Sequence, residues 1–531
     1  MEMGSGLIWN AACVLGSGIC LLLLSIVSIA LYRLFFHPLA RVPGPKLAAI
    51  SNIWHAYHAR NGGMFELACT LHQKYGEVVR VGPDELWFNS MEAFDKIYSS
   101  TKGFEKSDFY LATSLILPKI DCFLRPHFVD SLDLLSERDM KRYRLQRRLI
   151  GRVYQTSNVI KFEAAVDGVI NQVITRLKAL DGAELDLKEW MHIIAVECLG
   201  ASVLSWAPGL LKTGTDWGSS GHSYLAWRRK SVMGLFPTLT KLTMGTNLFE
   251  WVFRDVWNLK FPAPPNFRSF FPDVGKRISR RIKSALNPNA GKDRRIDLMA
   301  DLIQLHKDKP EFTEVYLRKM GMTNFGAGHD TMASTLTAIF TMIGTHDDVQ
   351  KKVTEEIRSA KNPLSYAGAV QLQYTRAASR EAMRLHPALT MSLSRRVPDN
   401  GLHMHGHFIP GGTTVGCNPA ALHRNADIVT GSNPEAYDPD RWLGGDPLDV
   451  RPMERYSLNW GGGPRTCPGK NLAEMVVYKV VSALFEQFDV EVVAPLQIGQ
   501  PSYYMSMITG AKARFLPVPP PMAGEISKRT G

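Results

Sequence analysis

Apolar residues along most of the chain recur at three- and four-residue steps, which is the spacing of an amphipathic helix. This pattern predicts long helices at 160–180, 187–199, 314–344, 347–359, 371–385 and 471–488. The alternation of a strand is rare: it predicts a hairpin at 77–81 and 85–89, with the turn VGPDE, and short strands at 403–409 and 413–417. The chain is therefore expected to be mainly α-helical, with a small β region.

The first apolar segment differs from the others because it carries no charge. No Asp, Glu, Lys or Arg occurs from Gly4 to Tyr32, and a helix of that length crosses a hydrocarbon core of about 30 Å. A cleaved signal peptide is the alternative, but it would begin with basic residues, whereas this chain begins with Glu2. Basic residues follow the segment, so we expect one retained transmembrane helix with the rest of the chain in the cytosol.

The chain is expected to divide into three parts. Residues 1–36 would be the membrane anchor, and residues 37–48 a proline-rich hinge stiffened by Pro43 and Pro45. Residues 49–531 show no internal repeat and would form the main domain.

Composition narrows the function classes. The content of 45% hydrophobic and 21% charged residues is typical of a globular protein. Seven cysteines are scattered without a C-x-x-C pair, which argues against a zinc ribbon and against a disulfide framework. The net charge of +12 predicts a basic surface, which is either simply solvated or faces membrane lipid or an acidic protein, and no nucleic-acid motif accompanies it.

The predicted helix at 314–344 contains an internal weak point. Gly326 and Gly328 each cost the helix about 1 kcal/mol relative to alanine, and the polar pair Asp330 and Thr331 follows. Such local violations often mark functional sites. We expect the Thr331 hydroxyl to bond the carbonyl of Ala327, four residues earlier. The alternative is a helix that ends at Gly328, with Asp330 capping a new one.

Glu381 and Arg384 lie one helical turn apart, but this spacing alone is a weak signal. Glu355 and Arg358 repeat it on a helix that is expected to face solvent. The context distinguishes the two pairs, because Arg441 follows the first pair in the segment PDRW. Two arginines and one carboxylate predict a buried, hydrogen-bonded cluster.

The segment WGGGPRTCPG places Cys467 just before a predicted helix N-terminus. The free amides and the dipole of a helix N-terminus favour an anion and lower the pKa of a thiol. Pro468 has no N–H, so the amides of Gly469 and Lys470 must supply any hydrogen bonds to sulfur. With Arg465 nearby, the segment predicts a bound thiolate. The alternative is a buried, inert cysteine in a glycine-rich turn.

These elements, in this order, resemble a cytochrome P-450. The family pattern F-x-x-G-x-R-x-C-x-G falls on Trp460, Gly463, Arg465, Cys467 and Gly469, with Trp460 in place of phenylalanine. The segment FHPLARVPGPKLAAIS resembles membrane-bound fungal members, including the pisatin demethylase-like group. The resemblance covers nearly the whole chain and implies the cytochrome P-450 fold, a helical haem-thiolate domain with a small β region, behind one N-terminal transmembrane helix.

The resemblance also assigns roles to residues. Cys467 would be the axial thiolate ligand of the iron of haem b, and Glu381, Arg384 and Arg441 would support its loop. Tyr143 and Arg147 match the family spacing W-x-x-x-R, with tyrosine replacing tryptophan. The haem propionates would be bound by Arg465, by Arg147 and by Arg395 or its neighbour Arg396. Ala327 and Gly328 would make room for dioxygen, and Asp330 and Thr331 would organise its protonation.

The implied reaction inserts one oxygen atom from dioxygen into a small apolar molecule, in fungal secondary-metabolite biosynthesis. Electrons would come from NADPH through a cytochrome P-450 reductase, at the endoplasmic reticulum membrane. The substrate pocket would draw on 116–124, Phe325, 389–393 and 504–508. Two alternatives stay open: a haem-thiolate isomerase or dehydratase that uses no dioxygen, and a non-catalytic haem sensor.

Overall fold

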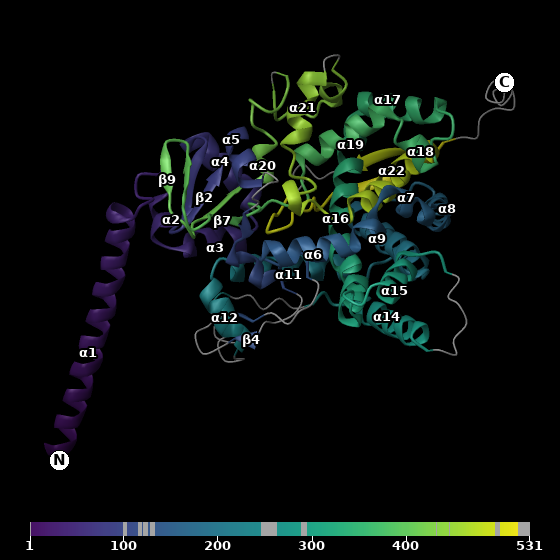
Figure 1. Cartoon of the computed structure of the whole chain (residues 1–531). Helices are drawn as coiled ribbons and strands as arrows, with labels where there is room; N and C mark the ends of the chain where they lie inside the picture. The colour runs from purple at the N-terminus through teal and green to yellow at the C-terminus, as the bar shows by residue number, and fades with distance from the viewer. Residues whose placement is uncertain are drawn as a thin grey trace, which may run out of the picture.

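A computed structural model describes residues 2–98, 104–114, 119–120, 126–127, 133–245, 257, 263–287, 295–431, 433–444, 447–493 and 500–518. Helices dominate this part of the chain and surround the long helix α16 (Glu314–Gly344), as Figure 1 shows. The predicted helices 314–344 and 347–359 begin and end where they were expected. The alternative of a helix break at Gly328 is wrong, since α16 continues through it.

The remaining helices follow the chain in sequence order. They are α1 (Glu2–Leu31), α2 (Lys46–Ile50), α3 (Asn52–Arg60), α4 (Met64–Tyr75), α5 (Met91–Tyr98), α6 (Met140–Ile150), α7 (Thr156–Val159), α8 (Glu163–Lys178), α9 (Leu187–Leu204), α10 (Leu210–Thr213), α11 (Ser219–Gly234), α12 (Pro237–Gly245), α14 (Phe271–Ala285), α15 (Leu298–Asp308), α17 (Asp347–Ser359), α18 (Tyr366–Ala369), α19 (Gln373–Leu385), α20 (Pro419–Leu422), α21 (Pro447–Arg455) and α22 (Lys470–Gln487).

The largest sheet has the strand order β1-β2-β10-β7-β3. Its strands are β1 (Val78–Gly82), β2 (Glu85–Phe88), β10 (Thr414–Cys417), β7 (Arg395–Arg396) and β3 (Glu105–Lys106). The predicted hairpin is confirmed, because β1 pairs antiparallel with β2. The smaller sheets contain β11 (Phe488–Val493), β12 (Lys512–Pro517) and β6 (Leu185–Asp186), then β4 (Lys119–Ile120) with β5 (Pro126–His127), and β8 (Leu402–Met404) with β9 (His407–Ile409).

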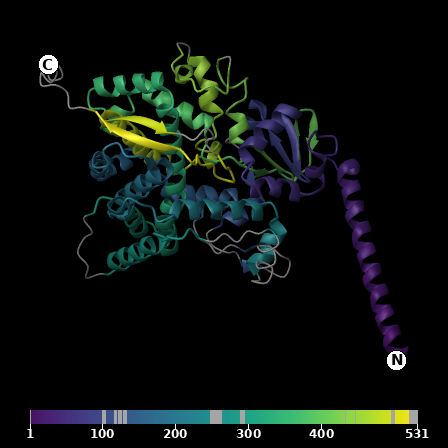
Figure 2. The same cartoon turned by 180° about the vertical axis from the view of Figure 1, so that it is seen from behind.

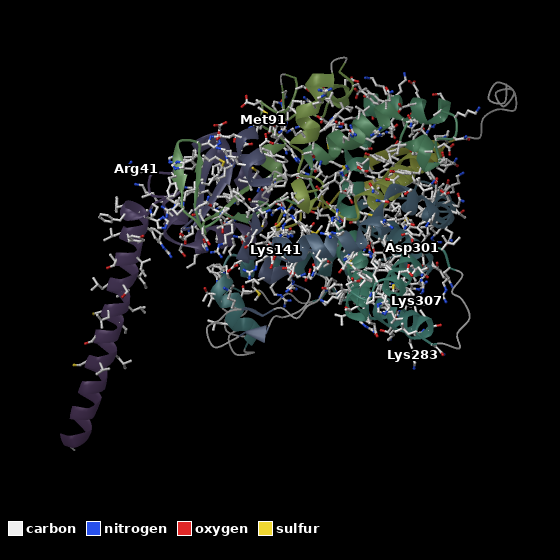
Figure 3. The ribbon with its side chains drawn as sticks, viewed as in Figure 1. Arg41, Met91, Lys141, Lys283, Asp301 and Lys307 are labelled. Carbon is white, nitrogen blue, oxygen red and sulfur yellow. The ribbon has the colours of Figure 1, made fainter. Side chains whose placement is uncertain are left out.

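Helix α1 extends away from the rest of the molecule in both views (Figures 1 and 2). The segment Ala12–Phe36 is long and apolar enough to cross a membrane, and none of its most apolar window is buried. Arg41, labelled in Figure 3, lies where this segment meets the domain. The N-terminal part of the chain thus has the form expected of an anchor.

The segment after the anchor is docked on the domain. The backbone N–H of Arg80, on β1, donates to the carbonyl of Pro43 at 2.7 Å. A Cβ on Gly44 would lie 2.3 Å from the Arg80 carbonyl oxygen, so only glycine fits there. The Arg80 side chain also donates to the carbonyl of Arg33 at 2.8 Å. These bonds fix the direction in which the anchor leaves the domain.

Helix α11 was not predicted, because part of it falls in the segment 208–223, whose glycines and polar residues predict a loop. Its sequence SSGHSYLAWRRKSVMG carries little apolar periodicity. Several of its buried side chains are polar, among them Ser219, Ser220 and Ser231. Tertiary contacts therefore stabilise this helix where an apolar stripe does not.

Candidate functional site

The loop that carries Cys467 is closed by backbone hydrogen bonds just before α22. The N–H of Cys467 donates to the carbonyl of Trp460 at 2.7 Å. Gly461 and Gly463 have φ values of +79° and +57°, which glycine adopts without strain. The amides of Gly469 and Lys470 both act to lower the pKa of the Cys467 thiol, and the N–H of Lys470 donates to the Cys467 carbonyl at 3.4 Å.

The pKa of Cys467 differs from the one expected from the sequence. Burial raises the pKa of the thiol above its usual value, while the Gly469 amide, Arg147 and the Lys470 amide act to lower it. The prediction that the helix N-terminus lowers the pKa overall is therefore wrong, because desolvation outweighs the amides. A metal ion removes this cost, since it binds the thiolate directly. Cys467 is also partly exposed, whereas Cys198 and Cys417 are buried.

Three cationic side chains gather on one side of this loop: Lys106, Arg395 and Arg465. Lys106 and Arg395 face each other in the register of β3 and β7 and are 8% and 4% exposed. None of the three has a carboxylate within 4 Å among the described residues. Burial, followed by the charges of Arg465 and Arg395, holds the pKa of Lys106 well below its usual value. Buried cations without counter-ions are costly, so this cluster fits a ligand that brings carboxylates.

The arginines of this cluster are oriented by backbone and rings. Arg465 donates to the carbonyls of Glu137 (2.6 Å) and Arg138 (2.8 Å), and its Nε is buried without a hydrogen-bond partner. Its guanidinium lies 4.3 Å from the centre of the Tyr143 ring. Of the two neighbours Arg395 and Arg396, Arg395 is buried, while the side chain of Arg396 is 51% exposed. Burial, then Arg395, lowers the pKa of Arg465 to about 10.

Lys106 was missed in the sequence. Its neighbourhood offers no motif, and only the pairing of β3 with β7 brings it beside Arg395. Its ammonium donates to the carbonyl of Leu135 at 2.5 Å and lies 4.3 Å from the centre of the Tyr110 ring.

The face of α16 near its glycines carries Ala327 and Thr331. The Thr331 hydroxyl donates to the Ala327 carbonyl at 2.8 Å, which confirms the predicted bond. Both residues are at least partly exposed. Gly328 lies on another side: a Cβ there would be 3.1 Å from Leu199 of α9. Gly328 thus lies where α9 packs closely on α16, and its role in making room for dioxygen stays a prediction.

Asp330 is adjacent to Thr331 in sequence but points toward α11. Its Oδ2 accepts hydrogen bonds from the Ser223 hydroxyl and from Trp227 Nε1, the latter at 3.1 Å. Its Oδ1 lies 3.1 Å from His329 Nδ1. Burial opposes the ionisation of this carboxyl, but His329 and His192 outweigh burial and lower its pKa to about 2.

Glu381 is the centre of the predicted cluster and is fully buried. Arg384 binds it through two nitrogens, at 2.7 and 2.8 Å, and Arg441 Nε donates to it at 2.7 Å. Trp442 Nε1 adds a further bond at 2.8 Å. Glu355 and Arg358 have the same spacing but form no such cluster, because Arg358 binds Asp489 instead.

His423 joins this cluster to the cysteine loop, and the sequence did not single it out. Its carbonyl accepts from Arg384 at 2.8 Å, and its Nε2 accepts from the N–H of Leu458 at 2.8 Å. The carbonyl of Leu458 in turn accepts from the N–H of Gly461 at 2.9 Å. The cluster therefore fixes the start of the loop that ends at Cys467.

The predicted pocket residues divide into two groups. Phe325 is fully buried in the core, 6.4 Å ring to ring from both Trp206 and Phe270, so it belongs to ordinary packing. Tyr504 stacks on Trp227 at 5.1 Å and on Phe109 at 5.8 Å, in an aromatic cluster that also contacts Met391. The range 116–124, apart from residues 119–120, lies outside the described residues.

A cavity of about 340 Å³ lies at the anchor side of the domain. Its lining includes Arg33, Glu85, Phe109, Phe236 and Ser394. Ser394 precedes the buried Arg395, and Phe109 belongs to the aromatic cluster around Tyr504. The cavity therefore lies between the end of the anchor and the aromatic cluster around Tyr504, and its lining also carries the charged residues Asp84, Glu85 and Asp108.

Known proteins are similar to this chain along almost its full length. The sequence model of the family described as Cytochrome P-450 matches residues 42–510. The cytochrome P-450 monooxygenase sdnT of Sordaria araneosa is 50% identical, over 97% of this chain and 97% of the relative. The monooxygenase hepC of Aspergillus oryzae is 29% identical, over 87% and 89%. A pisatin demethylase of Fusarium vanettenii is 27% identical, over 93% and 94%.

Proposed function

The chain belongs to the cytochrome P-450 family of haem-thiolate monooxygenases, and we therefore propose that Cys467 is the ligand of its haem iron. The main support for this proposal is that two features occur at the same place. The amides of Gly469 and Lys470 favour the thiolate of Cys467, and a cation cluster without carboxylates lies beside the same loop. Haem brings both an iron for the thiolate and two propionates for the cations.

Four cations would hold the propionates. We assign Arg465 and Arg395 as before, with Arg147 on the helix before them, and add Lys106. The buried Nε of Arg465 has no partner and would gain one. Trp460, Gly463 and Gly469 shape the loop so that the sulfur is reachable.

Bound haem supplies the activation of dioxygen and the transfer of one oxygen atom. The chain supplies the surroundings for this chemistry. Ala327 and Thr331 line the face of α16 that bears the accessible hydroxyl, and Thr331 can hold a proton-bearing water because a hydroxyl both donates and accepts. Asp330 supplies a fixed charge behind them. Gly328 lets α9 approach α16.

The electron donor would be an NADPH-dependent cytochrome P-450 reductase. Helix α6 exposes Lys141, Arg144 and Arg148 to solvent. The charge of Arg147, on the same helix, acts to lower the pKa of Cys467. The position of Lys141 is marked in Figure 3. A basic surface so close to the cysteine suits an acidic redox partner. The apolar helix would hold the enzyme, in contact with lipid, at the cytosolic face of the endoplasmic reticulum.

The substrate would be a small apolar molecule of fungal secondary metabolism. The aromatic cluster around Tyr504 supports this class, because it would suit an apolar molecule that arrives from lipid. The similarity to monooxygenases from Sordaria, Aspergillus and Fusarium supports the fungal setting.

Replacing Cys467 tests the proposal. The Cys467→Ala protein should lose the red-shifted band of the reduced, carbon-monoxide-bound spectrum. Cys69→Ala is the control, because Cys69 is also partly exposed but lies on α4. Retention of the band in Cys467→Ala would place the ligand elsewhere. Dependence of turnover on NADPH would separate a monooxygenase from an isomerase or dehydratase.

A further inference from the structure

Three side chains that can bind a metal ion converge in the core, where α9 packs along α16. They are His192 of α9 and His329 and Asp330 of α16, and each is at most 2% exposed. The Nε2 atom of His192 lies 2.9 Å from Nδ1 of His329, which in turn lies 3.1 Å from Oδ1 of Asp330. One ligand atom from each residue therefore lies within 4.8 Å of the other two.

Hydrogen bonds within the protein leave this group incomplete. A hydrogen bond between the two imidazoles uses both Nε2 of His192 and Nδ1 of His329. Oδ1 of Asp330 is then buried without a hydrogen-bond partner, although Oδ2 accepts from Ser223 and Trp227. A buried carboxylate oxygen without a partner destabilises the fold. This oxygen faces His329 and needs a positive partner that the described residues do not supply.

Asp216, in the loop before α11, is placed to orient His192. Its Oδ2 lies 3.0 Å from Nδ1 of His192 and accepts from the N–H of Ser220 at 2.9 Å. The contact with His192 is not aligned as a hydrogen bond, and a small rotation of the ring would complete it. A histidine that binds a metal directs its other ring nitrogen at such a carboxylate. A proton held on Nδ1 leaves the lone pair of Nε2 for a metal.

The charge of the group also favours a cation. Asp216 and Asp330 are both buried, and neither has a Lys or Arg within 4 Å in the part of the chain that the structure describes. With neutral imidazoles the group carries two negative charges, and buried charges without counter-ions are costly. One divalent cation would balance both.

We propose that His192, His329 and Asp330 bind one zinc ion and that Asp216 orients His192 toward it. Imidazole nitrogens and carboxylate oxygens are usual zinc ligands, and three of them leave the fourth tetrahedral position to a water. With bonds of about 2.0–2.1 Å, the ligand atoms of a tetrahedral zinc lie about 3.3 Å apart. The contacts of 2.9 and 3.1 Å therefore need to widen by only about 0.2–0.4 Å.

The zinc would have a structural role. It would join α9 to α16 and, through Asp216, both helices to the loop before α11. The four side chains are at most 3% exposed, so the metal is shielded from large molecules. The proposal does not depend on the haem chemistry, because the group contains none of the residues assigned to the thiolate or the propionates.

The experiment measures zinc in the full-length holoenzyme. The protein is purified with an affinity tag that contains no histidine, incubated with zinc chloride and dialysed. Zinc and iron are then counted by inductively coupled plasma mass spectrometry, and we expect one zinc per haem iron. His192→Gln and His329→Gln should both lose the zinc at unchanged iron content. His72→Gln is the control, because it alters a buried histidine of α4 and should keep the zinc.

The parent protein supplies a second measurement, which holds even where a variant fails to fold. X-ray absorption at the zinc edge should show scattering from two imidazole ligands at about 2.0–2.1 Å. A parent protein without stoichiometric zinc would overturn the proposal and assign the four side chains to hydrogen bonding alone. Zinc that persists in both glutamine variants would overturn it as well, because the metal would then be bound elsewhere.

Discussion

Arg384 donates to the backbone carbonyl of His423 at 2.8 Å, and the His423 ring accepts the N–H of Leu458 at 2.8 Å. A buried salt bridge is thereby connected, through one residue, to the loop that presents Cys467. Burial and then the charges of Arg384 and Arg424 lower the pKa of His423 to about 3, so its ring stays neutral and can accept this bond.

Removing Glu381 should destabilise the haem-binding state. Glu381→Ala leaves two buried arginines uncompensated, and breaking a buried pair in this way costs about 3–5 kcal/mol. We expect little or no haem in the purified protein, measured as the ratio of haem to protein absorbance. Glu355→Ala is the control, because Glu355 has the same spacing to an arginine but is exposed. Full haem content in Glu381→Ala would show that the loop holds without the cluster.

Acid should weaken the fold below pH 6.5, in part through two histidines, the buried His423 and the half-buried His386. Burial and then Arg424 lower the pKa of His386 to about 4, and His423 behaves similarly with a pKa of about 3. Below the unfolded pKa of about 6.5, the unfolded chain binds protons that the folded chain does not. The free energy of unfolding should therefore fall by up to about 1.4 kcal/mol per pH unit for each histidine.

This loss should begin near pH 6.5 and level off only as the pH passes the folded values, about 4 for His386 and about 3 for His423. The measurement is the midpoint of thermal haem loss between pH 7.5 and 4.5. His386→Phe should reduce the slope. A midpoint that is as pH-dependent in His386→Phe as in the parent would remove His386 from this account.

Lys106→Met should weaken haem binding without weakening the protein. Methionine keeps the length of the side chain but removes a buried cation that lacks a carboxylate partner among the described residues. We expect haem transfer to apomyoglobin to be faster by about tenfold, which corresponds to about 1.4 kcal/mol, while the haem-free protein melts no earlier. Lys96→Met is the control, because Lys96 pairs with Glu92 on the surface. An earlier melting point of the haem-free Lys106→Met protein would indicate a structural role instead.

Thr331→Ala should uncouple oxygen reduction from substrate oxidation. Alanine keeps the helix and removes the hydroxyl that now donates to Ala327. Positioned proton transfer contributes about 10²–10⁴ to a rate, so peroxide per NADPH should rise clearly while haem content stays constant. Thr337→Ala is the control, since Thr337 makes the same bond four residues back, to Ala333, but is buried. Equal peroxide yields in the two variants would assign Thr331 to packing.

Removing residues 1–36 should release most of the protein from membranes and keep the haem. The segment Ala12–Phe36 carries none of the buried core, so its loss leaves the domain intact. Some membrane binding can persist, because apolar surface near the cavity remains. Fractionation measures the first effect and haem absorbance the second. A truncated protein without haem would show that the bond from Arg80 to Arg33 is part of the fold.

The sequence alone determined the features that depend on local order. Periodicity predicted α16 and α17 to the residue, because a helix that packs on one face repeats its apolar residues at helical spacing. The bond from Thr331 to Ala327 and the amides around Cys467 were likewise predictable, since both lie within a few residues of their partners. The family followed from the order of these motifs.

Only the tertiary structure decided which distant side chains share a space. Lys106 meets Arg395 because β3 pairs with β7, and His192 meets His329 because α9 lies along α16. Neither pair has a spacing that periodicity can detect. The pKa of Cys467 was predicted in the wrong direction for the same reason. The local amides can be inferred from the sequence, whereas the burial that outweighs them depends on the packing of the whole fold.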